Sequence, residues 1–144
     1  MKTTTLILMS ILILASGCAA HRSSDFSGGG YNRSPHVIVS QVDCDKTVDR
    51  APVATGSMFV SIKYPINMRR AGITGEVIVR FLVTEKGQVR EMQVLKSTQP
   101  EFEPAISESR QYFRFFPAYK ADTPTSSWVD YEFKFTFDDD SAGA

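Results

Sequence analysis

Apolar and polar residues alternate along two stretches of the chain. Four apolar residues occupy every second position of the first stretch: Val77, Val79, Phe81 and Val83. Five occupy every second position of the second stretch: Val129, Tyr131, Phe133, Phe135 and Phe137. A period of two places such residues on one face of a β-strand. The pattern therefore predicts two strands, over 76–84 and 128–137, that each cover a core with one face.

A hairpin is expected after the first of these strands. Gly87, in the segment 84–88, suits the positive φ that a short hairpin loop requires. The return strand is expected over 89–96, and the consecutive charges Arg90 and Glu91 break its alternation, which indicates a β-bulge.

Two helices are predicted on either side of this hairpin. Pro65 favours the first turn of a short helix, and Gly72 is typical of the left-handed residue at which a helix stops. Gly75 then lets the backbone pass closely through a crowded corner into the next strand. The second helix is expected over 98–113, where Phe102, Ile106, Ser109 and Phe113 form one apolar stripe.

The N-terminal part of the folded region is less regular. The segment 36–42 (HVIVSQV) is rich in β-branched residues and predicts a peripheral strand, and residues 43–50 predict a polar loop. Residues 51–63 are expected to be extended, with a turn at Thr55 and Gly56.

The first residues are typical of a secretory signal. Lys2 precedes a short apolar run, 6–15, which is about half of the roughly 20 residues that a membrane-spanning helix needs. The sequence LASGC that ends at Cys18 resembles the lipobox of bacterial lipoproteins, whose cysteine is lipidated. An ordinary signal peptide with an incidental cysteine is the alternative. Lipidated Cys18 would be unable to form a disulfide with Cys44, so no intrachain disulfide is expected.

Composition and charge exclude several classes of function. The chain has 144 residues, 42% of them hydrophobic, and its 16 basic and 16 acidic residues give no electrostatic case for nucleic-acid binding. The acids Asp138, Asp139 and Asp140 are interpreted as a solvated tail and not as a metal site. We expect no catalytic residues, no metal and no cofactor, because no His, Cys or paired-acid constellation falls in one predicted pocket.

The order helix, strand, hairpin, strand, helix, strand resembles the C-terminal domain of the TonB family. The residues that carry this resemblance lie at the joints between elements: Tyr64, Pro65, Gly72, Gly75, Gly87, Phe113 and Pro117. The family usually has tryptophan where this chain has Phe113. The resemblance implies an α+β, two-layer fold, a three-stranded antiparallel sheet packed by two helices, with an extra N-terminal strand as an option.

The expected domain organisation follows. Residues 1–17 are predicted to be the signal peptide, and 18–35 the lipidated N-terminus and a flexible tether. Residues 36–50 are the N-terminal strand and loop, 51–140 the TonB-like domain, and 141–144 a tail. The resulting location is the periplasm, anchored to the cell-envelope membrane through Cys18, with the outer membrane favoured.

The resemblance implies a binding module, not an enzyme. In this family the domain captures an extended segment of an outer-membrane transporter as an added β-strand, so the partner is expected to be such a transporter or another envelope protein. The docking strand is expected to be 128–137, with Trp128, Asp130, Glu132, Lys134 and Thr136 facing outward and with Ser61 and Lys63 as further contacts. The outward charges have a second interpretation, the protection of an exposed edge from indiscriminate pairing.

Two further functions stay open at this point. The chain could be an energy transducer proper that retains its N-terminal apolar run as an anchor, although it lacks the long proline-rich spacer of such proteins. An envelope enzyme of unknown chemistry is the weaker alternative. The sequence does not identify the partner, the transported substrate or the oligomeric state.

Overall fold

The structure is a computed structural model that describes residues 35–138. The predicted signal peptide, Cys18, most of the tether and the residues after Asp138 lie outside this range. The elements in chain order are β1 (Pro35–Cys44), β2 (Val53–Ala54), α1 (Ser57–Ser61), α2 (Ile66–Ala71), β3 (Gly75–Val83), β4 (Val89–Ser97), the 3-10 turn η1 (Pro100–Phe102), α3 (Glu103–Ser109), the 3-10 turn η2 (Arg110–Tyr112), β5 (Phe115–Phe116), β6 (Ala118–Lys120), β7 (Thr123–Thr125) and β8 (Ser127–Phe137).

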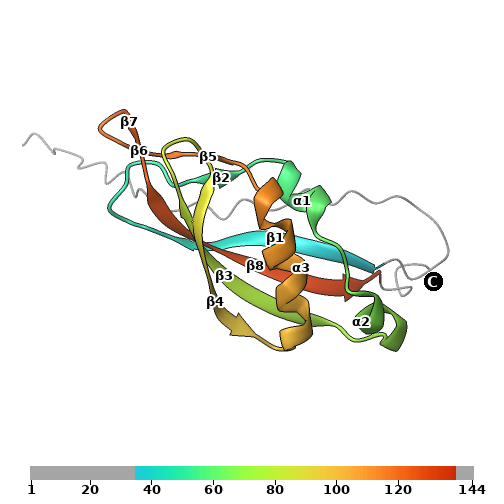
Figure 1. Ribbon diagram of the computed structural model, residues 1–144. Coiled ribbons are helices and arrows are strands. Elements are labelled where there is room, and N and C mark those ends of the chain that lie inside the picture. The colour runs from blue at the N-terminus through green and yellow to red at the C-terminus, as the bar shows by residue number, and fades with distance from the viewer. Residues whose placement is uncertain (1–34, 139–144) are drawn as a thin grey trace, which may run out of the picture.

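The main sheet has four antiparallel strands in the order β1-β8-β3-β4. Strands β2 and β5 form a small second sheet, and β6 and β7 form a hairpin. Figure 1 shows α3 crossing one face of the main sheet, with α1 and α2 on the same side. The fold is therefore the predicted two-layer α+β arrangement, and the additional N-terminal strand is present as β1.

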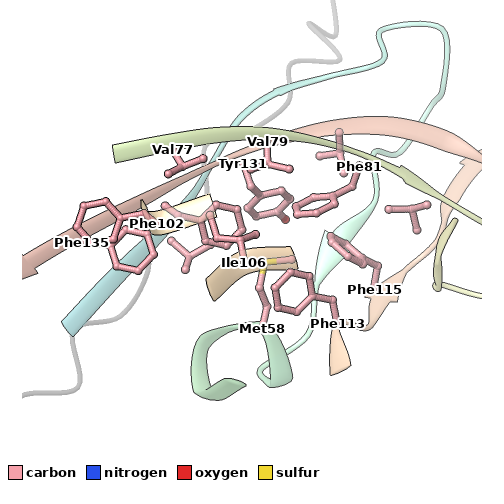
Figure 2. Packing of buried hydrophobic residues seen from close by; sticks show 14 of the residues in the cluster. Met58, Val77, Val79, Phe81, Phe102, Ile106, Phe113, Phe115, Tyr131 and Phe135 are labelled. Carbon is pink, nitrogen blue, oxygen red and sulfur yellow. The ribbon is translucent and has the colours of Figure 1, made fainter. Parts of the chain in front are cut away.

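The core lies between the sheet and this helical layer. Both predicted alternating rows face inward: the side chains of Val77, Val79, Phe81 and Val83 on β3, and those of Val129, Tyr131, Phe133 and Phe135 on β8, are buried. The predicted stripe of the second helix is buried as well, from Phe102 through Ile106 and Ser109 to Phe113. Figure 2 shows the aromatic rings of this cluster between the strands and the helices.

Several pairs of aromatic rings are in close contact inside the core. The rings of Phe102 and Phe135 stack with centroids 4.2 Å apart, and Phe81 meets Phe113 edge to face at 5.7 Å. Offset stacking and edge-to-face contact are the favourable geometries for aromatic pairs. Phe113 therefore fills its core position as predicted, and Pro117 separates β5 from β6.

The first predicted helix ends as its sequence indicates. Pro65 is its N-cap, one residue before α2 begins, and Gly72 is its C-cap in the left-handed conformation, with φ 65°. The N–H of Gly72 donates to the Arg69 carbonyl and that of Ile73 donates to the Met68 carbonyl. These two hydrogen bonds are the pair that defines a Schellman motif.

The predictions for Gly75 and Gly87 are also confirmed, and the two glycines are required for different physical reasons. A Cβ on Gly75 would lie 2.6 Å from Thr98 Oγ1 and 2.7 Å from Phe102 Cε2, so the corner is crowded by side chains. Gly87 has φ +75°, and a Cβ there would lie 1.9 Å from the Phe115 carbonyl oxygen. The hairpin loop is thus pressed against the backbone of β5. The bulge predicted in β4 is also present, since the register shifts where Arg90 is the extra residue.

The prediction for residues 51–63 is wrong in part. The turn at Thr55 and Gly56 is present, but it leads into the short helix α1. This helix has no side-chain cap, and it buries Met58 completely. Burial of one side chain in the core, and not local helix propensity, accounts for the helix.

Candidate functional site

Strand β8 was predicted to be the docking edge, and in the structure it is an interior strand of the main sheet. It pairs with β1 on one side over nine residue pairs and with β3 on the other over nine. Its backbone donors and acceptors face strands on both sides, so it has no open edge here.

The outward side chains predicted for β8 do share one face of the sheet, away from the helices. Asp130 on this face is engaged by Arg80 of β3, whose Nε and Nη2 donate to the two carboxylate oxygens at 2.7 and 2.8 Å. The Asp130 side chain is 8% exposed and that of Arg80 is 41% exposed. The hydrogen bonds to Asp130 raise the pKa of Arg80 above its ordinary value. Such a two-point ion pair is geometrically specific.

The other charges of this face also balance across strands. Lys96 Nζ of β4 lies 2.7 Å from Glu76 Oε1 of β3, and this hydrogen bond lowers the pKa of Glu76. The charge of Lys134 on β8 acts on Glu76 in the same direction. The hydrogen bond to Glu76 raises the pKa of Lys96, and the charge of Glu132 adds to this effect. Alternating signs leave the face without a strong field of one sign, and Thr136 extends it toward the end of β8.

Trp128 lines a hollow at the opposite end of β8. The hollow has a volume of about 320 Å³ and is lined by Asp43, Cys44, Asp45, Arg80, Gln93, Trp128 and Asp130. A hydrogen bond from the backbone N–H of Thr47 lowers the pKa of Asp45.

Cys44 in this hollow is disulfide-bonded. The expectation that the chain holds no intrachain disulfide is therefore wrong for this structure. The expectation treated the thiol of Cys18 as occupied by lipid, and one sulfur cannot carry both a lipid and a disulfide.

Ser61 and Lys63 lie on the helical side of the sheet. They line a groove of about 510 Å³ between the segment that precedes α2 and helix α3, which contributes Glu108 and Ser109. The hydroxyl of Ser109 donates to the Ser61 carbonyl at 2.9 Å. The structure thus places these two predicted contacts on the face opposite to the outward side chains of β8, so the two sets do not form one site.

Tyr64 connects this groove to the end of β8. Its ring lies 5.6 Å from Phe102, 5.5 Å from Phe135 and 5.2 Å from Phe137, measured between centroids. Its hydroxyl donates to the Ile73 carbonyl, just after α2. The Tyr-Pro step is therefore a packing joint that fixes the segment holding Ser61 and Lys63.

Strand β1 is the element that the functional prediction missed. It covers the edge of β8 that no other described strand covers, and Val39 is buried against the core at 2% exposure. The hydroxyl of Tyr131 on β8 accepts the N–H of Ala54 at 3.0 Å and donates to Gln41 Oε1 of β1 at 3.3 Å. Burial raises the pKa of this tyrosine. One buried hydroxyl therefore links β1, β8 and β2.

Neither a metal-binding cluster nor a membrane-spanning helix is present in the described part of the chain. Among residues 35–138, no group of three or more His, Cys, Asp or Glu side chains is arranged to hold a metal ion. Within the same range, no helix has the length and apolar character to cross a bilayer.

Comparison with known proteins agrees with the geometry. The family model described as Gram-negative bacterial TonB protein C-terminal matches residues 60–137, more than half of the chain. The solved structures include a similar one, the solution NMR structure of Pseudomonas aeruginosa TonB CTD. The similarity has a TM-score of 0.51 and 22% sequence identity, and it covers 66% of this chain and 91% of that one. No curated protein matches the sequence. Because the family model matches more than half of the chain, from the end of α1 to the end of β8, the chain belongs to the TonB C-terminal domain family.

Proposed function

We propose that the protein is a non-catalytic envelope protein that binds an extended segment of an outer-membrane transporter, or of another envelope protein, by β-strand addition. Membership of the TonB family supports a TonB-like envelope role. The observation that carries the mode of binding is β1 itself. The family model begins at residue 60, so β1 is an extended segment from outside the matched region, and it is seated along the edge of β8.

The edge of β8 has the properties that strand addition requires. Its long antiparallel ladder with β1 supports this mode, because the backbone of β8 already pairs with an extended segment along this edge. Core residues below the edge also offer contacts to alternate side chains, as Val39 makes here. Backbone hydrogen bonds supply affinity in this mode, and alternate side chains supply selectivity.

A titration with peptides tests this function. Synthetic peptides from the periplasmic N-terminal segments of TonB-dependent transporters of the same bacterium are titrated into the full chain, with scrambled peptides as controls. We expect saturable binding of at least one native peptide. Lys134→Ala should change its binding free energy by about 1 kcal/mol or less, because one exposed charge contributes little. If no native peptide binds to the folded protein more tightly than its scrambled control, the proposed function is wrong.

We further propose that Cys18 is lipidated and that it tethers the domain to the periplasmic side of the outer membrane. Metabolic labelling with a fatty acid should label the wild type but not Cys18→Ser. The intact mass of the mature protein should be that of a lipidated chain whose first residue is Cys18. A Cys18–Cys44 disulfide would instead give an unlabelled chain whose mass rises by about two hydrogens on reduction. That result would exclude the lipid anchor.

A further inference from the structure

Strand β1 occupies the edge through which the proposed function would operate. Among residues 60–137 alone, β8 would have β3 on one side and no strand on the other. We infer that β1 is a built-in competitor, and that a partner peptide binds by replacing the Pro35–Gln41 part of β1 beside β8. This inference rests on the proposed function and adds to it a regulatory element and a preferred class of peptide.

The side chains of β1 are less buried than those of β8, so they hold their strand in the sheet less firmly. Only Val39 of β1 is buried, whereas Ile38 is 36% exposed and Val42 is 49% exposed. Strand β8 instead buries Val129, Tyr131, Phe133 and Phe135 in the core. Backbone pairing is therefore a large part of what retains β1. An incoming strand can make the same backbone hydrogen bonds, so the exchange loses few of them.

The register of the β1–β8 ladder defines which part of β1 can exchange. Seven consecutive pairs run from Pro35 to Gln41, and the register then shifts at Val42 before the last two pairs. Beyond this bulge, the N–H of Asp45 donates to the Trp128 carbonyl at 3.1 Å, which holds the far end of β1. Bulges interrupt a ladder, so the segment before Val42 can separate while the rest stays paired.

The opposite end of the ladder is closed by a contact near the surface. His36 Nδ1 lies 3.1 Å from Asp138 Oδ1, and both side chains are substantially exposed, at 39% and 56%. An exposed pair of this kind contributes little to stability. Separation of β1 is therefore expected to begin at Pro35 and to stop at the bulge.

The contacts of β1 also describe the peptide that would replace it. Val37 and Val39 pack on the core, and Gln41 accepts a hydrogen bond from the buried Tyr131 hydroxyl. Ile38, between the two valines, points to the outer face opposite Lys134. The favoured ligand is thus an extended segment with apolar residues two positions apart, followed by a hydrogen-bond acceptor. Charges at the two apolar positions would be buried without partners and should be rejected.

A matched pair of variants tests the inference in the full chain. Val37→Thr/Val39→Thr keeps β-branched shape but weakens the packing of β1, and Ile38→Thr makes the same kind of change on the exposed side of the strand. The probe is a labelled peptide with the sequence of residues 35–41 (PHVIVSQ), and the control peptide has aspartate at both valine positions. We expect the Val37→Thr/Val39→Thr variant to bind the probe about tenfold more tightly than the wild type, and Ile38→Thr to differ by less than about threefold. The control peptide should bind none of them.

Hydrogen exchange on the wild type provides a second measurement that needs no variant. Excess probe should accelerate exchange of the amides from Val37 to Gln41 and leave those of β8 protected. Slower exchange in β1 would mean that the probe adds to the outer side of β1, and this result would overturn the inference. Equal probe affinity in the wild type and the Val37→Thr/Val39→Thr variant would overturn it as well.

The transporter peptides separate this inference from the proposed function. If they bind the wild type and the Val37→Thr/Val39→Thr variant equally well, the function stands and β1 is not a competitor. If they bind the weakened variant more tightly, both proposals are supported. If they bind neither protein, the proposed function fails, whatever the probe of residues 35–41 does.

Discussion

Alanine substitutions at four glycines should produce a fixed order of destabilisation, with Gly87→Ala the most severe. The reason lies in both the conformation and the surroundings of Gly87. Its φ of +75° costs an alanine about 1–2 kcal/mol. Its new Cβ would also lie 1.9 Å from the Phe115 carbonyl oxygen, which is backbone and cannot rotate away.

The loop would therefore have to move away from β5. That movement stretches the hydrogen bond from the Phe115 N–H to the Gly87 carbonyl, 2.9 Å long in the structure. Overpacking of this kind typically costs about 1–3 kcal/mol, so the total is expected to be about 2–5 kcal/mol.

The other three glycines separate the two contributions. Gly75→Ala meets only side chains, those of Thr98 and Phe102, and should cost about 1–3 kcal/mol. Gly72→Ala has positive φ but no atom within 4 Å of its Cβ, so only the conformational cost of about 1–2 kcal/mol applies. Gly56 has helical φ and open space, and its alanine variant should be neutral or stabilised by up to about 1 kcal/mol.

Denaturant unfolding followed by circular dichroism measures the free energy of each variant. Equal m-values across the series would show that the same folded and unfolded states are being compared. If Gly87→Ala is no more destabilising than Gly72→Ala, the contact with β5 does not restrain the loop, and the reasoning is refuted.

Three further predictions concern single sites away from the edge of β8. Ala121 has φ 47° in the turn between β6 and β7, so Ala121→Gly should raise the unfolding free energy by about 0.5–1 kcal/mol in denaturant melts; a loss would contradict the strain. Arg80→Met leaves the buried carboxylate of Asp130 without its partner and should lower the denaturant midpoint, and a second change, Asp130→Leu, should recover part of the loss; additive losses would argue against the pair. The pKa of Glu76 is lowered by its hydrogen bond to Lys96, so its contribution is present above the ordinary value of 4.5 and is lost as the pH falls through the lowered value. Melts between pH 6 and about pH 2 should show a smaller loss on acidification for Glu76→Gln than for the wild type, and parallel curves would exclude this contribution.

The two strands predicted from strong periodicity are present at nearly the predicted bounds. The helix predicted over 98–113 is present as the shorter helix α3 flanked by the 3-10 turns η1 and η2. Strands β3 and β8 carry long alternating rows, and α3 carries a stripe, so burial of one face specifies each element locally. The stop at Gly72 was equally predictable, because few residues other than glycine adopt its conformation at low cost. The short elements were missed for the opposite reason. α1 and the pairs β2–β5 and β6–β7 form because they cover the core or each other, and no periodicity can develop over two to five residues.

The position of a strand within a sheet is not a local property. Alternation told which face of β8 is buried, but neighbouring strands are chosen by contacts between residues far apart, such as Val39 and Phe133. The outward charges of β8 were compatible with an edge strand and with an interior one. In the structure, the carboxylate of Asp130 pairs with Arg80 of the neighbouring strand. Alternation therefore predicted the strand and its buried face, but not its place between β1 and β3.

The segment before residue 60 changes how the family match applies to this chain. The matched region alone would leave the β8 edge bare, and a bare edge of mostly apolar residues invites unspecific pairing. A covering strand on the same chain removes that liability. It also raises the affinity that a ligand needs, since any ligand competes with a segment held nearby at a high effective concentration. Exposed charges can also protect an edge, but here the outward charges of β8 lie on the face of the sheet and leave the protection to β1. Selectivity for partner peptides then depends on how closely their alternate side chains match Val37 and Val39, so residues outside the family region would determine what the family fold can bind.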